Sequence, residues 1–471
     1  MNVKAMFKFI KVFIRNYIIA FISFLPLLTF DKNLLGNDTL IPIQYKKTIQ
    51  DNGLRVIMVE HHEFPVVAVE LLVKAGSVHD SQGKEGLANL VAQLLREGTH
   101  AKDSLEIAEE IDFIGGTLNA YGEYDSTSIT ATALAKHFPL ILNLISEVTR
   151  FPSFQPKELE FHRGKTVTSI LREKDNKMSI AARNFSEMLY GIHPYAHPPI
   201  GTVEGLKSIT RNDIEEFHRN HFLPNNAILT IVGDINTTEI VAAVKETFST
   251  WKKENITETP LPPIPRIDGY TIRIINKPDL TQTEIHVGHP GINRTDPDYF
   301  STLLFSYILG KGPTSRLYTK LRAEKGLTYS ATSLFDARNL QGPFLIRTYS
   351  KNESAIQTLR LVLDELQKIT SKGITNEELD SAKSYYVGHF PLSIETSSQI
   401  ASRIIEQEFY GLPEGYLEKY LVNIQSVSIE DVNRTIKRVL DPRNLVIVLV
   451  SKAEDIQADA KALGEVEVKE P

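Results

Sequence analysis

Two histidines in the stretch "HPYAH" are candidate metal ligands, because imidazole nitrogens bind zinc and related ions. His193 and His197 are four residues apart, a spacing that would place both side chains on one face of a helix. Pro194 and Pro198 oppose such a helix, since proline lacks a backbone N–H and fixes its φ angle. We therefore do not interpret this stretch as a metal site.

The stretch "EEFHRNHF" is a second candidate, because Glu215, His218 and His221 recur at helical spacing. It lies directly before "LPNN", a sequence typical of the turn that ends a helix. A solvated helix end explains the pattern better than a metal site does. No three of the 13 histidines form another convincing zinc motif.

Other reaction chemistries lack the residues that they need. The chain has no cysteine, which excludes disulfides, thiol catalysis and thiolate zinc sites. It also has no Gly-x-Ser-x-Gly nucleophile motif. The net charge of -6 gives no support to nucleic acid as a partner.

The stretch "GLANLVAQLLREGT" is predicted to be a helix with one apolar face. Leucine and valine recur from Leu87 to Leu95 at the three-to-four-residue spacing of a helix. Asn89, Ala92 and Gln93 lie together on another face of the same helix. This second face carries two amides and a methyl group, so it offers little chemistry of its own.

The elements that must position these residues form two similar halves of an α+β chain. A charged and proline-rich linker, 251–270, separates an N-terminal lobe, 44–250, from a C-terminal lobe, 271–455. Each lobe opens with alternating strands, continues through amphipathic helices, and closes with a turn and a buried strand. The order of elements therefore predicts one α+β domain used twice, with each sheet packed against helices.

Five stretches, in order along the chain, resemble landmarks of the pitrilysin family, the inverted zincins with an H-x-x-E-H motif. The resemblance covers about 44–455. The matching stretches are Gly86–Thr99, Gly115–Thr130, His193–Thr210, Leu223–Ile235 and Gly312–Phe335. It implies a clamshell in which two homologous lobes, together with those of a partner, enclose a chamber.

The zinc chemistry of that family is missing from this sequence. The family's two histidines and its general-base glutamate fall on Asn89, Gln93 and Ala92. The family's third ligand, a glutamate, falls near Thr168 or Ser169, and Glu173 lies about one turn away. Amide groups are poor zinc ligands and alanine is none, so we expect no zinc and no cofactor in this chain.

The Arg/Tyr signature of the family's second half is retained. Arg316 and Tyr329 lie in "SRL" and "GLTYS", and the matching residues of active members reach across to the metal site. A guanidinium and a phenol can stabilise the negative charge that develops on a carbonyl oxygen during amide cleavage. The alternatives are that Arg316 pairs with an acid such as Glu324, and that Tyr329 packs as an ordinary strand residue.

Asn119 and Ala120 match the family's active-site edge strand, which holds an extended substrate by main-chain pairing. The alternative is that they belong to an ordinary strand of a sheet.

These features indicate the subunit of a two-chain zinc metallopeptidase that does not carry the zinc. The resemblance implies a homologous partner that bears zinc in an intact H-x-x-E-H motif, and a peptide as substrate. Arg316 and Tyr329 would complete the partner's active site. The alternative is a catalytically inert structural or peptide-binding homologue, like the core subunits of the respiratory bc1 complex.

The two ends of the chain are expected to lie outside the lobes. Residues 1–30 place lysines and an arginine before an apolar run, the pattern of a signal peptide or a membrane anchor. We therefore expect an exported protein, periplasmic or anchored to the inner membrane on its periplasmic side. Residues 456–471 are expected to be a tail.

Overall fold

The computed structural model describes residues 43–257 and 260–470, so the expected signal peptide or anchor at 1–30 lies outside the described residues. The described residues form one compact unit, and it contains two six-stranded sheets. Among the described residues, no helix is both long enough and apolar enough to cross a lipid bilayer.

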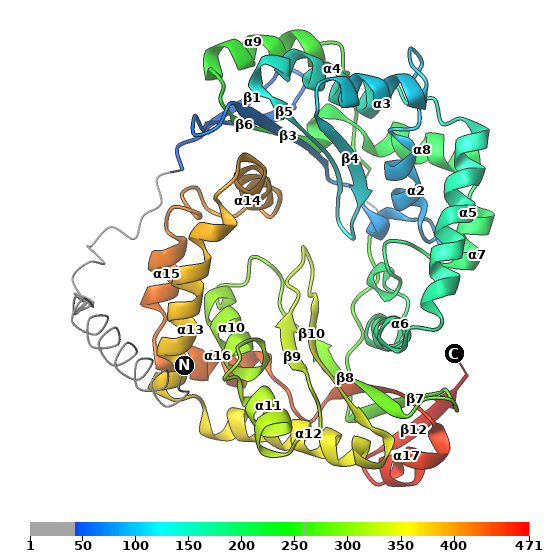
Figure 1. Cartoon of the computed structure of the whole chain (residues 1–471), viewed down its shortest axis with the longest axis vertical. Helices are drawn as coiled ribbons and strands as arrows, with labels where there is room; N and C mark the ends of the chain where they lie inside the picture. The colour runs from blue at the N-terminus through cyan, green and yellow to red at the C-terminus, as the bar shows by residue number, and fades with distance from the viewer. Residues whose placement is uncertain (1–42, 258–259, 471) are drawn as a thin grey trace, which may run out of the picture. The chain divides into compact units, whose positions relative to one another are not determined.

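The first sheet, in the upper half of Figure 1, has the strand order β1-β2-β6-β3-β5-β4. The early strand β2 and the late strand β6, far apart along the chain, pair in parallel. The strands β3, β5 and β4 are antiparallel to their neighbours. The strands are β1 (Lys46–Ile49), β2 (Arg55–Glu60), β3 (Val66–Val73), β4 (Thr117–Gly122), β5 (Thr127–Leu134) and β6 (Ala227–Gly233). Strand β6 reads AILTIVG and is buried along its whole length, as its aliphatic and β-branched residues favour.

The second sheet repeats this topology with the order β12-β7-β11-β8-β10-β9. The opening strand β7 again pairs in parallel with the late strand β11, and β8, β10 and β9 follow in antiparallel order. The strands are β7 (Tyr270–Asn276), β8 (Gln282–Pro290), β9 (Ala331–Phe335), β10 (Pro343–Lys351), β11 (Leu445–Ser451) and β12 (Glu465–Lys469). The prediction of an α+β fold used twice is confirmed.

The outermost strand differs between the two sheets, and it corrects the expected tail. In the first sheet the outer strand β1 precedes β2 along the chain, whereas in the second sheet β12 comes from the C-terminus. Strand β12 pairs in parallel with β7, from Glu465 opposite Thr271 to Lys469 opposite Ile275. Residues 456–471 are therefore not a separate tail, because helix α17 (Ala453–Lys461) and β12 complete the second lobe.

Most helices of each half pack against the sheet of the same half. In the first half α2 contacts β4, α4 contacts β5, and α9 contacts β2. The helices of this half are α2 (Leu87–Leu94), α3 (Ser104–Phe113), α4 (Phe138–Arg150), α5 (Pro156–Glu173), α6 (Lys177–Tyr190), α7 (Val203–Ser208), α8 (Arg211–His221) and α9 (Thr237–Phe248). Those of the second half are α10 (Tyr299–Ser306), α11 (Arg316–Tyr318), α12 (Ala355–Lys372), α13 (Asn376–His389), α14 (Ser397–Phe409), α15 (Tyr420–Ser426), α16 (Ile429–Val439) and α17.

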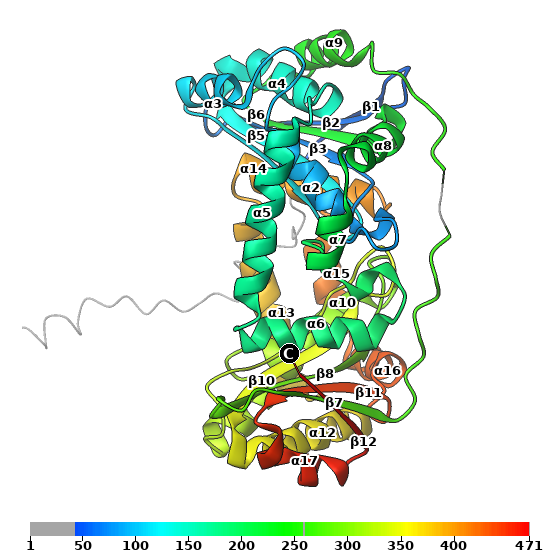
Figure 2. The same cartoon turned by 90° about the vertical axis from the view of Figure 1, so that its right-hand side faces the viewer.

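Two helices are exchanged between the halves. Helix α6 of the first half packs on β11 and β8 of the second sheet (Figure 2). Phe185 of α6 is buried there in a cluster with Leu345 and Val448. Helix α14 of the second half packs in turn on β6 and β3 of the first sheet, with Ile404 buried. Each sheet is therefore covered on one face by its own helices and on the other by a helix of the opposite half.

Candidate functional site

Helix α2, which matches the zinc helix of the pitrilysin family, begins at a turn that side-chain hydrogen bonds hold in place. Gly86 has a φ of 104°, a left-handed conformation that favours glycine. The Asp80 carboxylate accepts hydrogen bonds from the backbone N–H groups of Gly86 and Ala88, at 2.7 and 2.8 Å. Burial raises the pKa of Asp80 to about 7. The predicted apolar face, including Leu90 and Val91, is fully buried in the first lobe.

The other face of α2 carries no zinc ligand at the three positions singled out in the sequence. Ala92 is fully buried, and Asn89 lies where α2 passes close to β4. A Cβ atom added to Gly122 of β4 would lie 3.2 Å from the Asn89 Cα, so a larger residue there would push the two elements slightly apart. Gln93 faces α5, where its Oε1 lies 3.1 Å from His162 Nδ1 and 3.4 Å from Thr166 Oγ1. These side chains do not form a zinc site.

The positions considered for the third ligand also lack a carboxylate directed at Gln93. The Thr168 hydroxyl donates a hydrogen bond of 2.8 Å to the carbonyl of Gly164 in its own helix. Ser169 lines a cavity of about 350 Å³ together with Gln93, and Glu173 is the last residue of α5.

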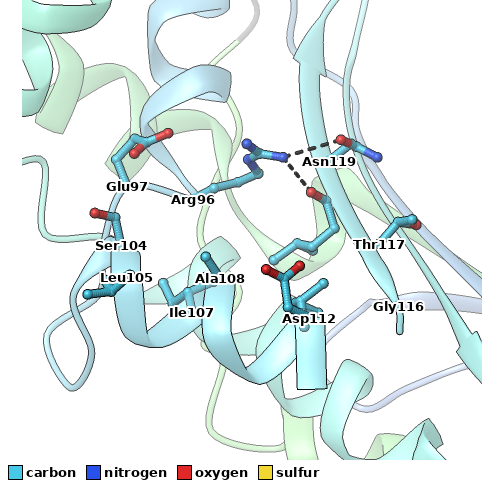
Figure 3. A pocket seen from close by; sticks show the side chains of 12 residues that line it. Arg96, Glu97, Ser104, Leu105, Ile107, Ala108, Asp112, Gly116, Thr117 and Asn119 are labelled. Carbon is cyan, nitrogen blue, oxygen red and sulfur yellow. Dashed lines mark hydrogen bonds between the residues drawn. The ribbon is translucent and has the colours of Figure 1, made fainter. Parts of the chain in front are cut away.

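The strand that carries Asn119 and Ala120 is the edge strand β4 of the first sheet. Both residues pair with β5 on one side, opposite Thr130 and Ile129. A cavity of about 610 Å³ lies between β4 and helix α3, and Figure 3 shows its lining. Arg96 donates hydrogen bonds to the Leu118 carbonyl and to Asn119 Oδ1, the latter at 3.2 Å (Figure 3). A peptide that adds to this edge would therefore compete with Arg96 for the Leu118 carbonyl.

Arg316 lies in the second half, where two acidic residues hold its guanidinium. Its Nε and Nη2 donate to the two carboxylate oxygens of Glu378, at 2.6 and 2.8 Å, and Nη2 also donates to the Gly373 carbonyl at 2.9 Å. Glu365 lies 3.6 Å from Nη1. The expected acid Glu324 pairs instead with Lys320. Arg316 thus joins α11 to the start of α13, and most of its donors are used within the chain.

Tyr329 is exposed, and the guanidinium beside it is that of Arg322. The Tyr329 side chain precedes β9 and is 73% exposed, so it does not pack as an interior strand residue. Arg322 Nη1 donates to the Tyr329 carbonyl at 3.2 Å, and its guanidinium carbon lies 5.9 Å from the centre of the tyrosine ring. Arg322 was missed in the sequence, although it lies seven residues before Tyr329 in the same motif.

The histidines considered as metal ligands have structural roles. His193 Nδ1 accepts a hydrogen bond from the backbone N–H of Tyr195 and caps a short 3-10 helix. His218 Nε2 donates to the Thr149 carbonyl at 2.7 Å, and His221 packs against His79 and Phe217. Burial lowers the pKa of His218 and of His221 to about 4, so both are neutral at physiological pH.

Comparison with known proteins decides the family. The sequence profile of the insulinase family, peptidase family M16, matches residues 55–203, and that of the peptidase M16 inactive domain matches residues 208–386. The chain belongs to the M16 family, the pitrilysin-type peptidases. The resemblance found in the sequence is thereby confirmed.

Relatives in this family match the described fold over most of their length. An uncharacterized zinc protease of Mycobacterium leprae is 27% identical over 86% of this chain and 91% of its own. One from Bacillus subtilis is 23% identical over 86% and 98%. The crystal structure of a peptidase M16 inactive domain from Pseudomonas fluorescens is similar with a TM-score of 0.82 and 27% identity, over 87% of this chain and 98% of that one. A protease from Helicobacter pylori matches with a TM-score of 0.81 at 23% identity, over 87% and 99%.

Proposed function

We propose that this M16 chain is the subunit of a two-chain peptidase that lacks the catalytic zinc motif. The observation that carries the proposal is the combination of an empty zinc helix with an exposed Tyr329. A homologous chain with an intact H-x-x-E-H motif would supply zinc and the general base. This chain would supply donors to the bound peptide, and the two pairs of lobes would enclose it.

In this proposal Tyr329 and a neighbouring guanidinium polarise the scissile carbonyl. The tyrosine hydroxyl donates to the oxygen as negative charge develops there, and a cation beside it stabilises the same charge. Arg322 suits this role better than Arg316, since Arg322 contacts Tyr329 while Arg316 is held by Glu378. We therefore assign Arg316 to positioning the segment and Arg322 to the carbonyl.

The edge strand β4 supports peptide binding in the same proposal. Asn119 and Ala120 lie on a strand with a free edge, and an extended peptide can pair with such an edge through its main chain. Arg96 would release the Leu118 carbonyl when the peptide binds.

We also propose export to the periplasm, which cell fractionation of the native protein would test.

The experiment is to co-express the full chain with its H-x-x-E-H partner and to measure cleavage of an unfolded peptide. Tyr329→Phe should lower kcat by about 10²-fold to 10³-fold, since it removes one donor to the developing oxyanion. Arg322→Ala should have a comparable effect. Tyr349→Phe and Arg266→Ala are matched controls, and both should retain activity.

Full activity of the Tyr329→Phe complex would contradict this function. Peptide binding without cleavage in the complex would instead favour the inert, peptide-binding alternative. The Arg96 hydrogen bond to the Leu118 carbonyl fits instead the purely structural form of this alternative, because it occupies a carbonyl with which a peptide would pair.

A further inference from the structure

Three side chains with metal-binding atoms meet where α2 ends and α5 begins. Glu158 and His162 lie one turn apart on the same face of α5, and Glu97 follows the C-terminus of α2. Their ligand atoms all lie within 4.8 Å of one another. Within the described part of the chain, this is the one group of three histidine or acidic side chains that meets such a criterion.

The separation of two of these ligand atoms already suits a bound metal ion. His162 Nε2 lies 3.1 Å from Glu97 Oε1. Zinc binds nitrogen and oxygen ligands at about 2.0–2.2 Å, so tetrahedral ligand atoms lie about 3.3–3.5 Å apart. His162 is only 8% exposed, which keeps its ring in a fixed place.

Gln93 orients the histidine for this purpose. Its Oε1 accepts a hydrogen bond from His162 Nδ1 at 3.1 Å, and Thr166 contacts the same oxygen. With the hydrogen on Nδ1, the lone pair of Nε2 can point at the metal, an arrangement that metal-binding histidines use widely. The glutamine at an emptied family position therefore acts here as a positioning residue.

We propose that Glu97, Glu158 and His162 bind one divalent transition-metal ion, such as zinc or manganese. One imidazole and two carboxylates form a ligand set that suits these ions. The ion would connect the end of α2 to α5, and water would complete its coordination beside the cavity that Glu97 and His162 line. The site is separate from Asn89 and Ala92, and it does not depend on the function proposed above.

Arg96 and Lys165 bring positive charge close to Glu97, and this charge repels a bound cation. Neither residue makes an ion pair with Glu97, Glu158 or His162 among the described contacts, so the three ligands remain available to a cation. Their charge favours modest affinity over the very tight binding of a structural zinc site.

The test is a metal titration of the isolated full-length chain, purified without a histidine tag. Cobalt(II) is the probe, because its visible absorption reports coordination and the chain has no cysteine to bind it elsewhere. Saturable binding of one ion per chain is expected, together with a rise in melting temperature that zinc reproduces. Gln93→Ala should weaken binding by about 10-fold to 100-fold, and His162→Ala by more.

Glu158→Gln provides a second ligand variant that is less disruptive than a change at buried His162, and it too should weaken binding. Glu160→Gln, on the exposed side of the same helix, is the matched control and should bind as the wild type does. Absence of one-to-one binding, or equal affinity in the wild type and Glu158→Gln, would overturn the proposal. Because no peptide cleavage is measured, this result is distinguishable from failure of the two-chain peptidase.

Discussion

The ion pair between Arg316 and Glu378 helps to hold the fold together, because Glu378 has two structural contacts. Glu378 accepts two hydrogen bonds from the guanidinium, and it also completes the capping box at the start of α13 with Thr375. A carboxylate that both pairs with arginine and caps a helix contributes through two different contacts. This double use is the observation on which the proposed positioning role of Arg316 rests.

The first prediction concerns this carboxylate. Glu378→Ala should destabilise the chain by about 2–4 kcal/mol, because it removes one hydrogen bond of the capping box and leaves Arg316 without its main partner. Urea denaturation of the full chain measures the change. The neighbouring, exposed Glu377→Ala is the control, and an equal loss in both variants would show that the arginine pair contributes nothing.

The second prediction concerns two buried histidines. The pKa of His218 and of His221 in the folded chain is about 4, whereas an unfolded histidine titrates near 6.5. The unfolded chain therefore binds more protons, and stability is complete above pH 6.5 and is lost as the pH falls towards 4. Each histidine should account for about 3 kcal/mol of this loss.

His218→Gln should reduce the loss of stability between pH 6.5 and 4, as measured by denaturation at a series of pH values. Glutamine can still donate a hydrogen bond to the Thr149 carbonyl, so the packing of α8 is retained. The exposed His100→Gln is the matched control and should follow the wild type. A wild-type chain that stays equally stable from pH 7 to pH 4 would refute the burial argument.

For individual residues, the sequence predicted only those positions that follow from a pattern of nearby residues. The emptied face of α2 follows from helical periodicity, and Asn89, Ala92 and Gln93 could be placed without a structure. The contact between Arg322 and Tyr329 could not, because two arginines lie in one motif and only the fold shows which one reaches the tyrosine. The meeting of Glu97 with Glu158 and His162 depends on the packing of α2 against α5, which no spacing reveals.

The exchange of α6 and α14 is the main feature at the scale of elements. In each half the exchanged helix is the next α-helix after α5 or α13, and its apolar residues are buried on the other half's sheet. The order of strands and helices in each half could be predicted from alternating and helical patterns. The exchange could not, because an amphipathic helix does not encode which of two similar sheets it covers.

The third prediction concerns the centre of one exchanged contact. Phe185 is 1% exposed on α6 and packs among residues of the second sheet. Phe185→Ala should cost about 3–5 kcal/mol, because it removes buried surface and leaves a cavity. It should also make α6 more accessible to limited proteolysis.

Leu171→Ala on the adjacent helix α5 is the control, since this side chain is exposed. If Phe185→Ala were no less stable than Leu171→Ala, the packing of α6 on the second sheet would be wrong.

At the scale of the whole molecule, a buried carboxyl group lies between an element of each half. Glu70 of β3 accepts hydrogen bonds from Ser128 of the same sheet and from Ser402 of the exchanged helix α14. Burial raises the pKa of Glu70, since little solvent is present to stabilise its charge. The folded chain holds this proton more tightly than the unfolded chain does.

The fourth prediction follows from the sign of that shift. The stabilising proton is present at low pH and is lost as the pH rises through the pKa of folded Glu70. Glu70→Gln, which is neutral at all pH values, should raise the melting temperature at pH 8 and change it little at pH 4. The exposed Glu63→Gln is the control, and a Glu70→Gln chain that is less stable at pH 8 would contradict the burial effect.

The reciprocal exchange also makes the chain a fused pseudo-dimer, the single-chain counterpart of a domain-swapped pair. The joining segment between α9 and β7 has no helix or strand in its described residues. We therefore expect the two halves to stay associated when this segment is cut after folding, because each sheet has one face covered by a helix of the opposite half. Cleavage at a protease site engineered there should leave two fragments that co-elute, and either fragment expressed by itself should aggregate.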